Sequence, residues 1–219
     1  SEQFLSSRVK NMAISATIAM SAKSRKLKQE GLDIINLSLG EPDFNTPDVI
    51  KQAAIEAIHN NYSKYTPIAG FEDLKQAISN KFKRENNLDY KKSEIVVSTG
   101  AKQSLANAIL ALVDEGDEVL LPAPYWVSYA EQIKLAGGIP REIPTSIDTN
   151  FKVTPQQLQE AITSKTKMII YSSPCNPSGS LYTREELDAL AEVILKKENL
   201  FVLADEIYEY INFTGTPHA

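Results

Sequence analysis

From about residue 93 onward, short apolar runs alternate with segments of helical periodicity, and this alternation constrains the fold more than any other feature of the sequence. Runs of strand length occur at residues 95–98, 118–121, 139–143, 167–171 and 200–204. Helical patterns lie between successive runs, at residues 102–113, 125–136, 155–163 and 183–197. Repeated strand–helix–strand units place their strands in one mainly parallel sheet with helices packed on it. The pattern therefore predicts an α/β fold.

The first 90 residues are less regular. Residues 1 to about 30 carry apolar side chains at helical spacing and reach Gly31, which predicts an amphipathic helix that ends there. An apolar run at residues 34–39 leads into Gly40, which predicts a short strand followed by a loop. Two further helices are expected, at residues 47–60 and 71–86.

Composition excludes several classes of function. The net charge is -5 and no long basic run occurs, which argues against partners such as nucleic acids and acidic membrane surfaces. The single cysteine, Cys175, excludes an internal disulfide and fits a reducing cytoplasm, and it is best explained as a small packed residue. The only histidines, His59 and His218, lie far apart in the sequence, so no metal site is expected. No apolar run approaches the roughly 20 residues that span a bilayer, so we expect a soluble, cytoplasmic protein whose ligand is small.

Two loops that follow predicted strands carry residues suited to a cofactor, at the carboxyl ends where α/β sheets bind ligands. Thr99, Gly100 and Ala101 lead directly into a helix whose free N–H groups can receive a phosphate, although a plain tight turn explains the same residues. After the run at 118–121, two prolines present aromatic side chains that can either stack on a planar heterocycle or pack the next helix onto the sheet.

Two later loops carry polar side chains. Asn176 lies in a stiff loop between prolines, where its amide suits recognition, although an ordinary Pro-Gly turn is an equal alternative. Asp205 emerges from an apolar strand and must be paired or hydrogen-bonded to stay ionised. Its partner is expected to be either a ligand or a structural salt bridge. By themselves, Gly40 and Tyr65 indicate no more than ordinary turns.

Six motifs in order resemble the class I aminotransferases, specifically the bacterial aspartate aminotransferase branch. They are Gly40-Glu41-Pro42-Asp43-Phe44, Tyr65-Thr66-Pro67, Gly100-Ala101-Lys102-Gln103, Pro124-Tyr125-Trp126, Asn176-Pro177-Ser178-Gly179 and Asp205-Glu206-Ile207-Tyr208. Ser172 and Ser178 stand where the family commonly has an asparagine and a threonine. The resemblance implies a three-layer α/β sandwich, with residues 1–45 as an arm and small-domain segment and residues 46–219 as part of the large cofactor-binding domain.

The resemblance also implies pyridoxal 5'-phosphate as the cofactor. By it, Asp205 would pair with the protonated pyridine nitrogen, which strengthens the ring as an electron sink. Asn176 and Tyr208 would donate hydrogen bonds to the phenolic oxygen, and Trp126 would stack on the ring. The remaining implied cofactor contacts are the phosphate contacts of Gly100, Ala101 and Lys102, and of Tyr65 from a second subunit.

The implied substrates are an amino acid, with aspartate as the leading choice, and a 2-oxo acid. Gly40 would lie beside the α-carboxylate, while Thr17 and Lys102 would contact the distal carboxylate of a dicarboxylic substrate. Trp126 and Asn176 would line the same substrate site. Because Tyr65 would reach the cofactor of a neighbouring subunit, the resemblance implies a homodimer with a shared active site.

One catalytic part of the family is expected to lie outside this chain. Transamination needs a lysine that holds the cofactor covalently and moves the proton. The lysine segment that precedes a Thr-Gly-Trp-Arg-like stretch does not occur here. We therefore expect an inactive fragment of a longer aminotransferase. The alternatives are a related pyridoxal-phosphate lyase and a non-catalytic cofactor-binding or regulatory module.

The resemblance implies an incomplete sheet as well. In the resembling fold, two strands from later in the sequence separate residues 95–98 from the rest of the sheet. Their absence would uncover strand edges at 95–98 and 167–171, which is an aggregation liability.

Overall fold

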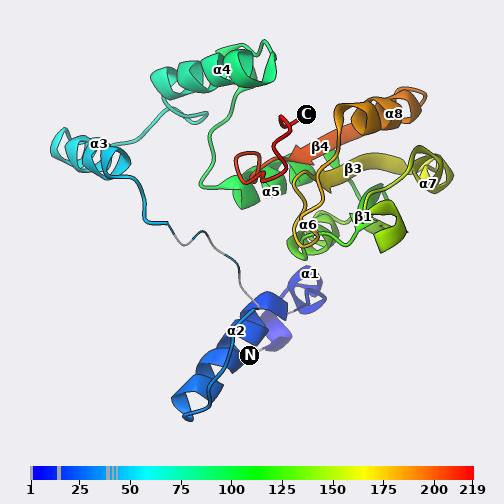
Figure 1. Cartoon of the computed structure of the whole chain (residues 1–219), viewed down its shortest axis with the longest axis horizontal. Helices are drawn as coiled ribbons and strands as arrows, with labels where there is room; N and C mark the ends of the chain where they lie inside the picture. Colours follow the sequence, from blue (N-terminus) through cyan, green and yellow to red (C-terminus); the bar gives the residue numbers. More distant parts are fainter. Residues whose placement is uncertain (1, 14–15, 38–39, 41, 43) are drawn as a thin grey trace. The chain divides into compact units, whose positions relative to one another are not determined.

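The computed structural model describes residues 2–13, 16–37, 40, 42 and 44–219 (Figure 1). The chain divides into two compact units. The first unit comprises Ser1–Ser15 and Thr99–Ala219, and the second comprises Ala16–Ser98. The sheet lies entirely in the first unit.

Four parallel strands form the sheet of the first unit, in the order β2-β1-β3-β4. Their bounds are Glu118–Ala123 for β1, Ile139–Pro144 for β2, Thr166–Ser172 for β3 and Phe201–Asp205 for β4. The central strands β1 and β3 are apolar along most of their length because both of their faces are covered. The predicted α/β fold with a parallel sheet is therefore confirmed.

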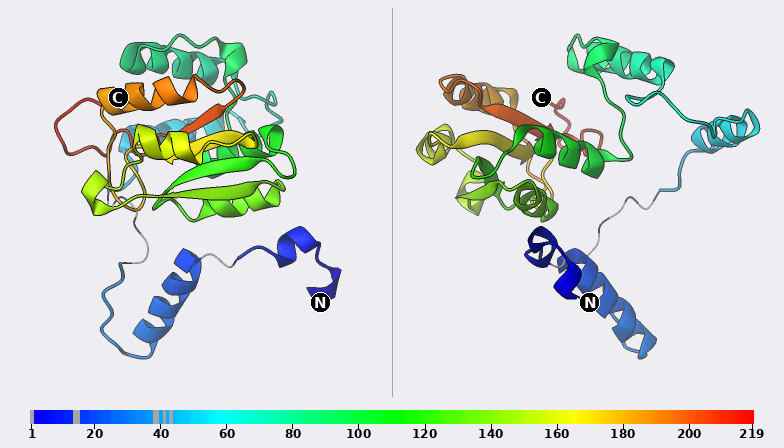
Figure 2. Two further views of the ribbon diagram at one scale, coloured as in Figure 1. Left: turned by 90° about the vertical axis from the view of Figure 1, so that its right-hand side faces the viewer. Right: turned by 180° about the vertical axis from the view of Figure 1, so that it is seen from behind.

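Helices cover both faces of this sheet, which makes three layers (Figure 2). Helices α5 (Ala101–Leu112) and α6 (Ser128–Leu135) pack on one face, and α7 (Pro155–Ala161) and α8 (Arg184–Ile194) pack on the other. Alternate residues of β1 point into the two layers, since Val119 and Leu121 belong to one core and Leu120 to the other. Val119, Leu120 and Leu121 are fully buried, so the core of the first unit lies against β1.

Local signals explain where several of these helices begin. A capping box starts α8, because the Thr183 hydroxyl accepts from the N–H of Glu186 while the Glu186 side chain accepts from the N–H of Thr183. Thr154 and Gln157 form the same arrangement at the start of α7. The short elements η1 (Glu2–Phe4), α1 (Ser7–Lys10) and η3 (Ile147–Thr149) complete the first unit.

The described residues of the second unit form three longer helices and one turn of 3-10 helix. They are α2 (Ala16–Gln29), α3 (Asp48–His59), α4 (Glu72–Asn86) and η2 (Lys92–Glu94). Gly70 is required beside Val97, because a Cβ at Gly70 would lie 2.7 Å from a methyl group of Val97 and its φ of +100° disfavours other residues.

Three predictions about local structure are wrong. Residues 95–98 form no strand, and Val97 instead donates its N–H to the carbonyl of Ala69 at 3.0 Å. A strand needs a ladder partner to be stable, and the described residues provide none here. Residues 34–37 are irregular, while residues 38–39 of that predicted strand lie outside the described residues. The single helix expected over residues 1–30 is replaced by η1, α1 and α2.

The uncovered edge of the sheet also differs from the expected one. The run at 167–171 lies in β3, which pairs with β1 on one side and β4 on the other. The strand β4 lies at the end of the sheet instead. Val202 in β4 is 47% exposed and Phe201 is 39% exposed. Among the described residues, β4 is therefore the edge strand that carries a candidate site residue, Asp205, and has unpaired backbone groups on one side.

Candidate functional site

The carboxyl ends of the parallel strands bring together most of the candidate residues. Trp126 follows β1, Asn176 follows β3, and Asp205 is the last residue of β4, with Tyr208 in the turn after it. Parallel strands end at the same edge of a sheet, and ligands of open α/β sheets bind there. Residues that directly follow parallel strands therefore lie at the same edge of the sheet, and this holds for any order of the strands.

Asp205 is a buried carboxylate with neutral partners. It is 9% exposed. One carboxylate oxygen, Oδ2, accepts a hydrogen bond from the hydroxyl of Tyr129 at 2.6 Å, and Oδ1 accepts from the N–H of Ile207 at 3.3 Å. Among the residues that the structure describes, no ion pair to Asp205 occurs. The salt-bridge alternative thus finds no support among the described residues, where Asp205 accepts hydrogen bonds from two neutral donors.

Tyr129 is a site residue that sequence reasoning missed. Its side chain is 1% exposed, and its ring contacts Trp126 edge-on with ring centroids 5.5 Å apart. Burial raises the pKa of Tyr129 above its ordinary range, and the Asp205 carboxylate adds to this effect. Tyr129 therefore remains a protonated donor. The sequence offered one signal, which was the position of Tyr129 three residues after Trp126. A phenol buried at that position requires a polar partner.

Asn176 and Tyr208 lie close together, and their implied contacts with a phenolic oxygen stay predictions. The side-chain amide of Asn176 donates to the hydroxyl of Tyr208 at 3.5 Å, the limit of a hydrogen bond. The loop around Asn176 is closed by two backbone bonds, from the N–H of Gly179 to the carbonyl of Cys175 and from the N–H of Cys175 to the carbonyl of Ser180. A rigid loop of this kind holds the amide of Asn176 in a fixed position.

The start of α5 has the geometry of an anion site. Gly100 is the N-cap with φ +86° and ψ 159°, a conformation that only glycine adopts readily. The first N–H groups of a helix have no intrahelical partner and carry its positive dipole end. Ala101 and Lys102 supply two of them, and the ammonium group of Lys102 lies 4.8 Å from the centroid of the Trp126 ring. Lys102 and Trp126 are thus brought together, as a cation over an aromatic ring.

Three candidate residues lie in the second unit. Tyr65 is fully exposed in the loop between α3 and α4. Gly40 is in irregular backbone, and its motif neighbours Glu41 and Asp43 lie outside the described residues. Thr17 is in α2, but its side chain also lies outside them. The roles of Tyr65, Gly40 and Thr17 therefore stay predictions.

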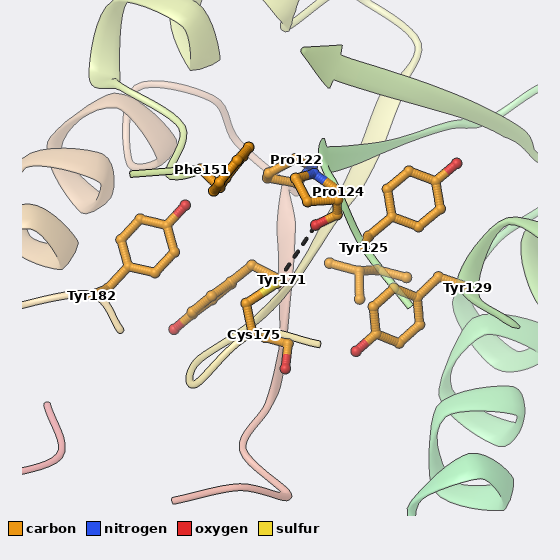
Figure 3. A pocket seen from close by; sticks show the side chains of 10 residues that line it. Pro122, Pro124, Tyr125, Tyr129, Phe151, Tyr171, Cys175 and Tyr182 are labelled. Carbon is orange, nitrogen blue, oxygen red and sulfur yellow. Dashed lines mark hydrogen bonds between the residues drawn. The ribbon is translucent and has the colours of Figure 1, made fainter. Parts of the chain in front are cut away.

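A small cavity lies beside the carboxyl ends of β1 and β3 (Figure 3). Its volume is about 10 Å³, roughly the least space that holds one water molecule. Cys175 lines it and donates from Sγ to the carbonyl of Pro124 at 3.5 Å, in agreement with a packing role for this cysteine. Rings of Tyr125 and Tyr129 lie on one side of the cavity in Figure 3, and Tyr171 and Tyr182 lie on the other.

Potential metal ligands come close at one place in the described chain. Ligand atoms of Glu206, Glu209 and His218 lie within 4.8 Å of one another. His218 Nε2 is 3.5 Å from Glu206 Oε1, so a histidine–carboxylate pair accounts for this contact. In the sequence, His218 was compared only with His59, so its contact with Glu206 was not predicted.

No helix among the described residues combines the length and apolar character required to cross a bilayer.

Comparison with known proteins adds family information to this geometry. The family model described as aminotransferase class I and II matches residues 32–218. An aspartate aminotransferase from Bacillus sp. (strain YM-2) is 49% identical over 217 residues, which cover 99% of this chain and 55% of that protein. An aspartate/prephenate aminotransferase from Nitrosomonas europaea is 51% identical over 211 residues, covering 96% of this chain and 53% of that protein.

Solved structures show the same similarity. The aspartate aminotransferase from Rhizobium meliloti superimposes with a TM-score of 0.95 at 41% identity, over 98% of this chain and 54% of that one. The Thermus thermophilus aspartate aminotransferase with maleate gives 0.94 at 41% identity, over 98% and 56%. The chain thus spans about half the length of the relatives that it matches.

Proposed function

Because this chain belongs to the class I and II aminotransferase family, we propose that the full-length protein is a pyridoxal-phosphate-dependent aminotransferase. It moves an amino group between an amino acid, with aspartate as the first choice, and a 2-oxo acid. One observation carries the proposal. Asp205 is a buried carboxylate at the ligand-binding edge of the sheet, and its described partners are neutral donors. Such a charge is suited to a cationic ring nitrogen.

The described residues fit this cofactor by the chemistry of their polar groups. The start of α5 offers backbone N–H groups and a positive dipole end for a phosphate. Asn176 offers an amide donor and Tyr208 a hydroxyl, for an oxygen that carries negative charge. Asp205 offers a negative charge for the protonated nitrogen. Together these three kinds of group match the three polar parts of pyridoxal phosphate.

Each of these residues has one task in the proposed mechanism. When bound, the cofactor supplies an electron sink for the α-carbon of the amino acid. Asp205 holds the proton at the ring nitrogen, and Asn176 and Tyr208 hold the phenolic oxygen. Trp126 covers the ring, while Gly100, Ala101 and Lys102 hold the phosphate. Transfer of the α-proton is assigned to a lysine of the full-length protein, so residues 1–219 alone are proposed to be inactive.

The choice of a dicarboxylic substrate rests on the relatives and on Lys102. Two relatives about half identical to this chain are named for aspartate, and one similar structure is named with maleate, itself a dicarboxylate. The ammonium group of Lys102 stands over the ring of Trp126, where it is available to a second carboxylate. Thr17, Gly40 and Asn176 are proposed as the other substrate contacts.

Assembly and location complete the proposal. A homodimer is proposed in which Tyr65, which is fully exposed, contacts the cofactor of the other subunit. Residues 1–45 are proposed as an arm and small-domain segment and residues 46–219 as part of the large domain. A cytoplasmic location is proposed because a single cysteine suits a reducing compartment.

The test is amino transfer by the full-length protein and its Asp205→Ala variant. The full-length protein is expected to convert aspartate and 2-oxoglutarate into oxaloacetate and glutamate. Asp205→Ala is expected to lower kcat by orders of magnitude, because the ring nitrogen loses its counter-charge. Rates are measured by coupling oxaloacetate to its reduction.

Other outcomes would distinguish the alternatives. Release of ammonia and pyruvate from an amino acid with a β-leaving group, such as serine, in place of amino transfer would identify a lyase. A full-length sequence without the family's lysine segment would favour a non-catalytic module. A near-normal rate in Asp205→Ala would refute the role assigned to that residue.

A further inference from the structure

The hydrogen bond between Tyr129 and Asp205 joins two distant parts of the first unit. Tyr129 lies in the first turn of α6, and Asp205 lies 76 residues later, at the end of β4. The O–O distance is 2.6 Å and both side chains are buried. Short bonds between a hydroxyl donor and a carboxylate belong to the stronger class of hydrogen bonds in proteins.

Packing accounts for the ring of Tyr129 but not for its hydroxyl. The ring belongs to the core between α5, α6 and the sheet, with Tyr125 stacked at 6.5 Å and Trp126 edge-on at 5.5 Å. A phenylalanine would make the same ring contacts. A buried hydroxyl costs free energy unless it is bonded, so the bond to Asp205 is the feature that distinguishes tyrosine here.

The two donors of Asp205 fix its orientation. Tyr129 holds Oδ2 from one side, and the N–H of Ile207 holds Oδ1 from the other. A carboxylate held at both oxygens cannot rotate freely about its terminal bond. Because Tyr129 and Ile207 are neutral donors, they stabilise the charge of Asp205 without cancelling it. Tyr129 stays protonated, since burial raises its pKa.

We propose that Tyr129 is a positioning residue, whose hydroxyl holds the Asp205 carboxylate in the orientation that receives the protonated ring nitrogen of the cofactor. This inference rests on the proposed function. Tyr129 acts through Asp205 and is assigned no contact with the cofactor. The ring of Tyr129 packs edge-on against Trp126. Trp126, which is proposed to cover the cofactor ring, and Tyr129, which is proposed to orient Asp205, therefore support each other.

The test measures cofactor affinity instead of turnover. The probes are pyridoxamine 5'-phosphate, which needs no covalent bond to a lysine, and its analogue with a C–H group in place of the ring nitrogen. Dissociation constants are measured by fluorescence titration of the full-length apoprotein. In Tyr129→Phe, the dissociation constant for pyridoxamine phosphate is expected to rise about tenfold, while that for the analogue changes less than about twofold.

Tyr182→Phe is the matched control. Tyr182 is also buried, and its hydroxyl accepts from the N–H of Val153 in the core on the other face of the sheet. Removal of this hydroxyl is expected to leave both affinities unchanged. In an Asp205→Ala background, Tyr129→Phe is expected to cause no further loss, because the two residues act as a unit.

The ratio of the two dissociation constants protects the result against partial unfolding. Only folded molecules bind, so a smaller folded fraction changes both apparent constants alike and leaves the ratio unchanged. An unchanged ratio in Tyr129→Phe, or an equal further loss in the Asp205→Ala background, overturns the positioning role and leaves the proposed function intact. Absence of pyridoxamine phosphate binding by the folded wild-type protein overturns the proposed function and this inference together.

Discussion

At the scale of single residues, the first unit holds several tyrosines whose hydroxyl groups are buried or partly buried. Tyr129, Tyr171 and Tyr182 all have pKa values raised first of all by burial. Tyr129 and Tyr182 satisfy their hydroxyls in opposite ways, because Tyr129 donates to a carboxylate and Tyr182 accepts from a backbone N–H. Because a buried phenol ionises less readily in the folded state than in the unfolded state, the free energy of unfolding falls at alkaline pH.

Tyr182 gives a prediction with a defined pH window. Burial raises its pKa to about 12 from an ordinary value of 10.0. Below pH 10 the phenol is neutral in both states, and its stabilising effect is fully present. Between about pH 10 and 12 the unfolded chain ionises first, so the free energy of unfolding falls, by at most ~3 kcal/mol from this residue. Chemical denaturation across pH 8 to 12 measures this loss.

Tyr182→Phe should change the shape of that profile. The variant leaves the N–H of Val153 without its acceptor, which costs about 1–3 kcal/mol near neutral pH. It cannot ionise, so the difference from wild type is expected to narrow as the pH approaches 12. Two parallel profiles would show that Tyr182 does not ionise late in the folded state.

At the scale of elements, local sequence specified the strands that are buried on both faces. The apolar runs at 118–121 and 167–171 fall within β1 and β3, because parallel central strands are mainly apolar. The start of α8 was equally predictable from Thr183 and Glu186. Residues 95–98 have the same apolar character and form no strand. A strand depends on its neighbour, and composition does not report whether a neighbour is present.

The candidate site was predictable to the same degree. Loop chemistry after each strand drew attention to Asn176 and Asp205, since strand ends converge in a parallel sheet. Tyr129 was missed because its partner lies 76 residues away in the sequence, and its neighbours Tyr125 and Trp126 already accounted for the aromatic character of the segment. Long-range pairing of polar groups is set by the packing of α6 against the sheet, which no local pattern contains.

The start of α5 gives a prediction about an element. Gly100→Ala places a side chain at φ +86° and ψ 159°, where strain costs about 1–3 kcal/mol. Relief of that strain would rotate the first N–H groups of the helix. Gly100→Ala in the full-length protein is therefore expected to weaken binding of pyridoxamine phosphate about tenfold or more, and to weaken binding of pyridoxamine without phosphate much less. Calorimetric titration measures both affinities.

Gly116 provides the matched control for Gly100. It also has φ +86° and open space where a Cβ would lie, but it precedes the amino end of β1, opposite the candidate site. Gly116→Ala is expected to lower stability without changing either affinity. Equal losses for the two ligands in Gly100→Ala would argue against a phosphate site at the start of α5.

At the scale of the whole molecule, the edge strand β4 is expected to promote association of residues 1–219 in solution. Its side chains Phe201 and Val202 are exposed, and β3 pairs with only one of its two edges. Free edges of apolar strands pair with other chains. Residues 1–219 expressed alone are therefore expected to aggregate or to unfold without cooperativity, as measured by sedimentation velocity and thermal circular dichroism.

A charge on that edge should reduce the aggregation. Val202→Lys places an ammonium group on an exposed position of β4 and is expected to increase the soluble fraction. Val119→Lys, in the buried centre of β1, serves as the contrasting variant and is expected to abolish folding. A sharp two-state transition from a soluble monomer of the unmodified 219 residues would contradict the expectation.

The position of Asp205 at the end of β4 predicts that binding of the proposed cofactor stabilises this strand against local opening. A ligand that binds only the folded form adds about 2.7 kcal/mol of stability at a free concentration about one hundred times its Kd. Asp205 keeps its position only while β4 pairs with β3. The added binding free energy therefore raises the cost of detaching β4 from the sheet. Amide hydrogen exchange in β4 should therefore slow as the proposed cofactor saturates the full-length protein, while exchange in β2, which two strands separate from β4, responds far less.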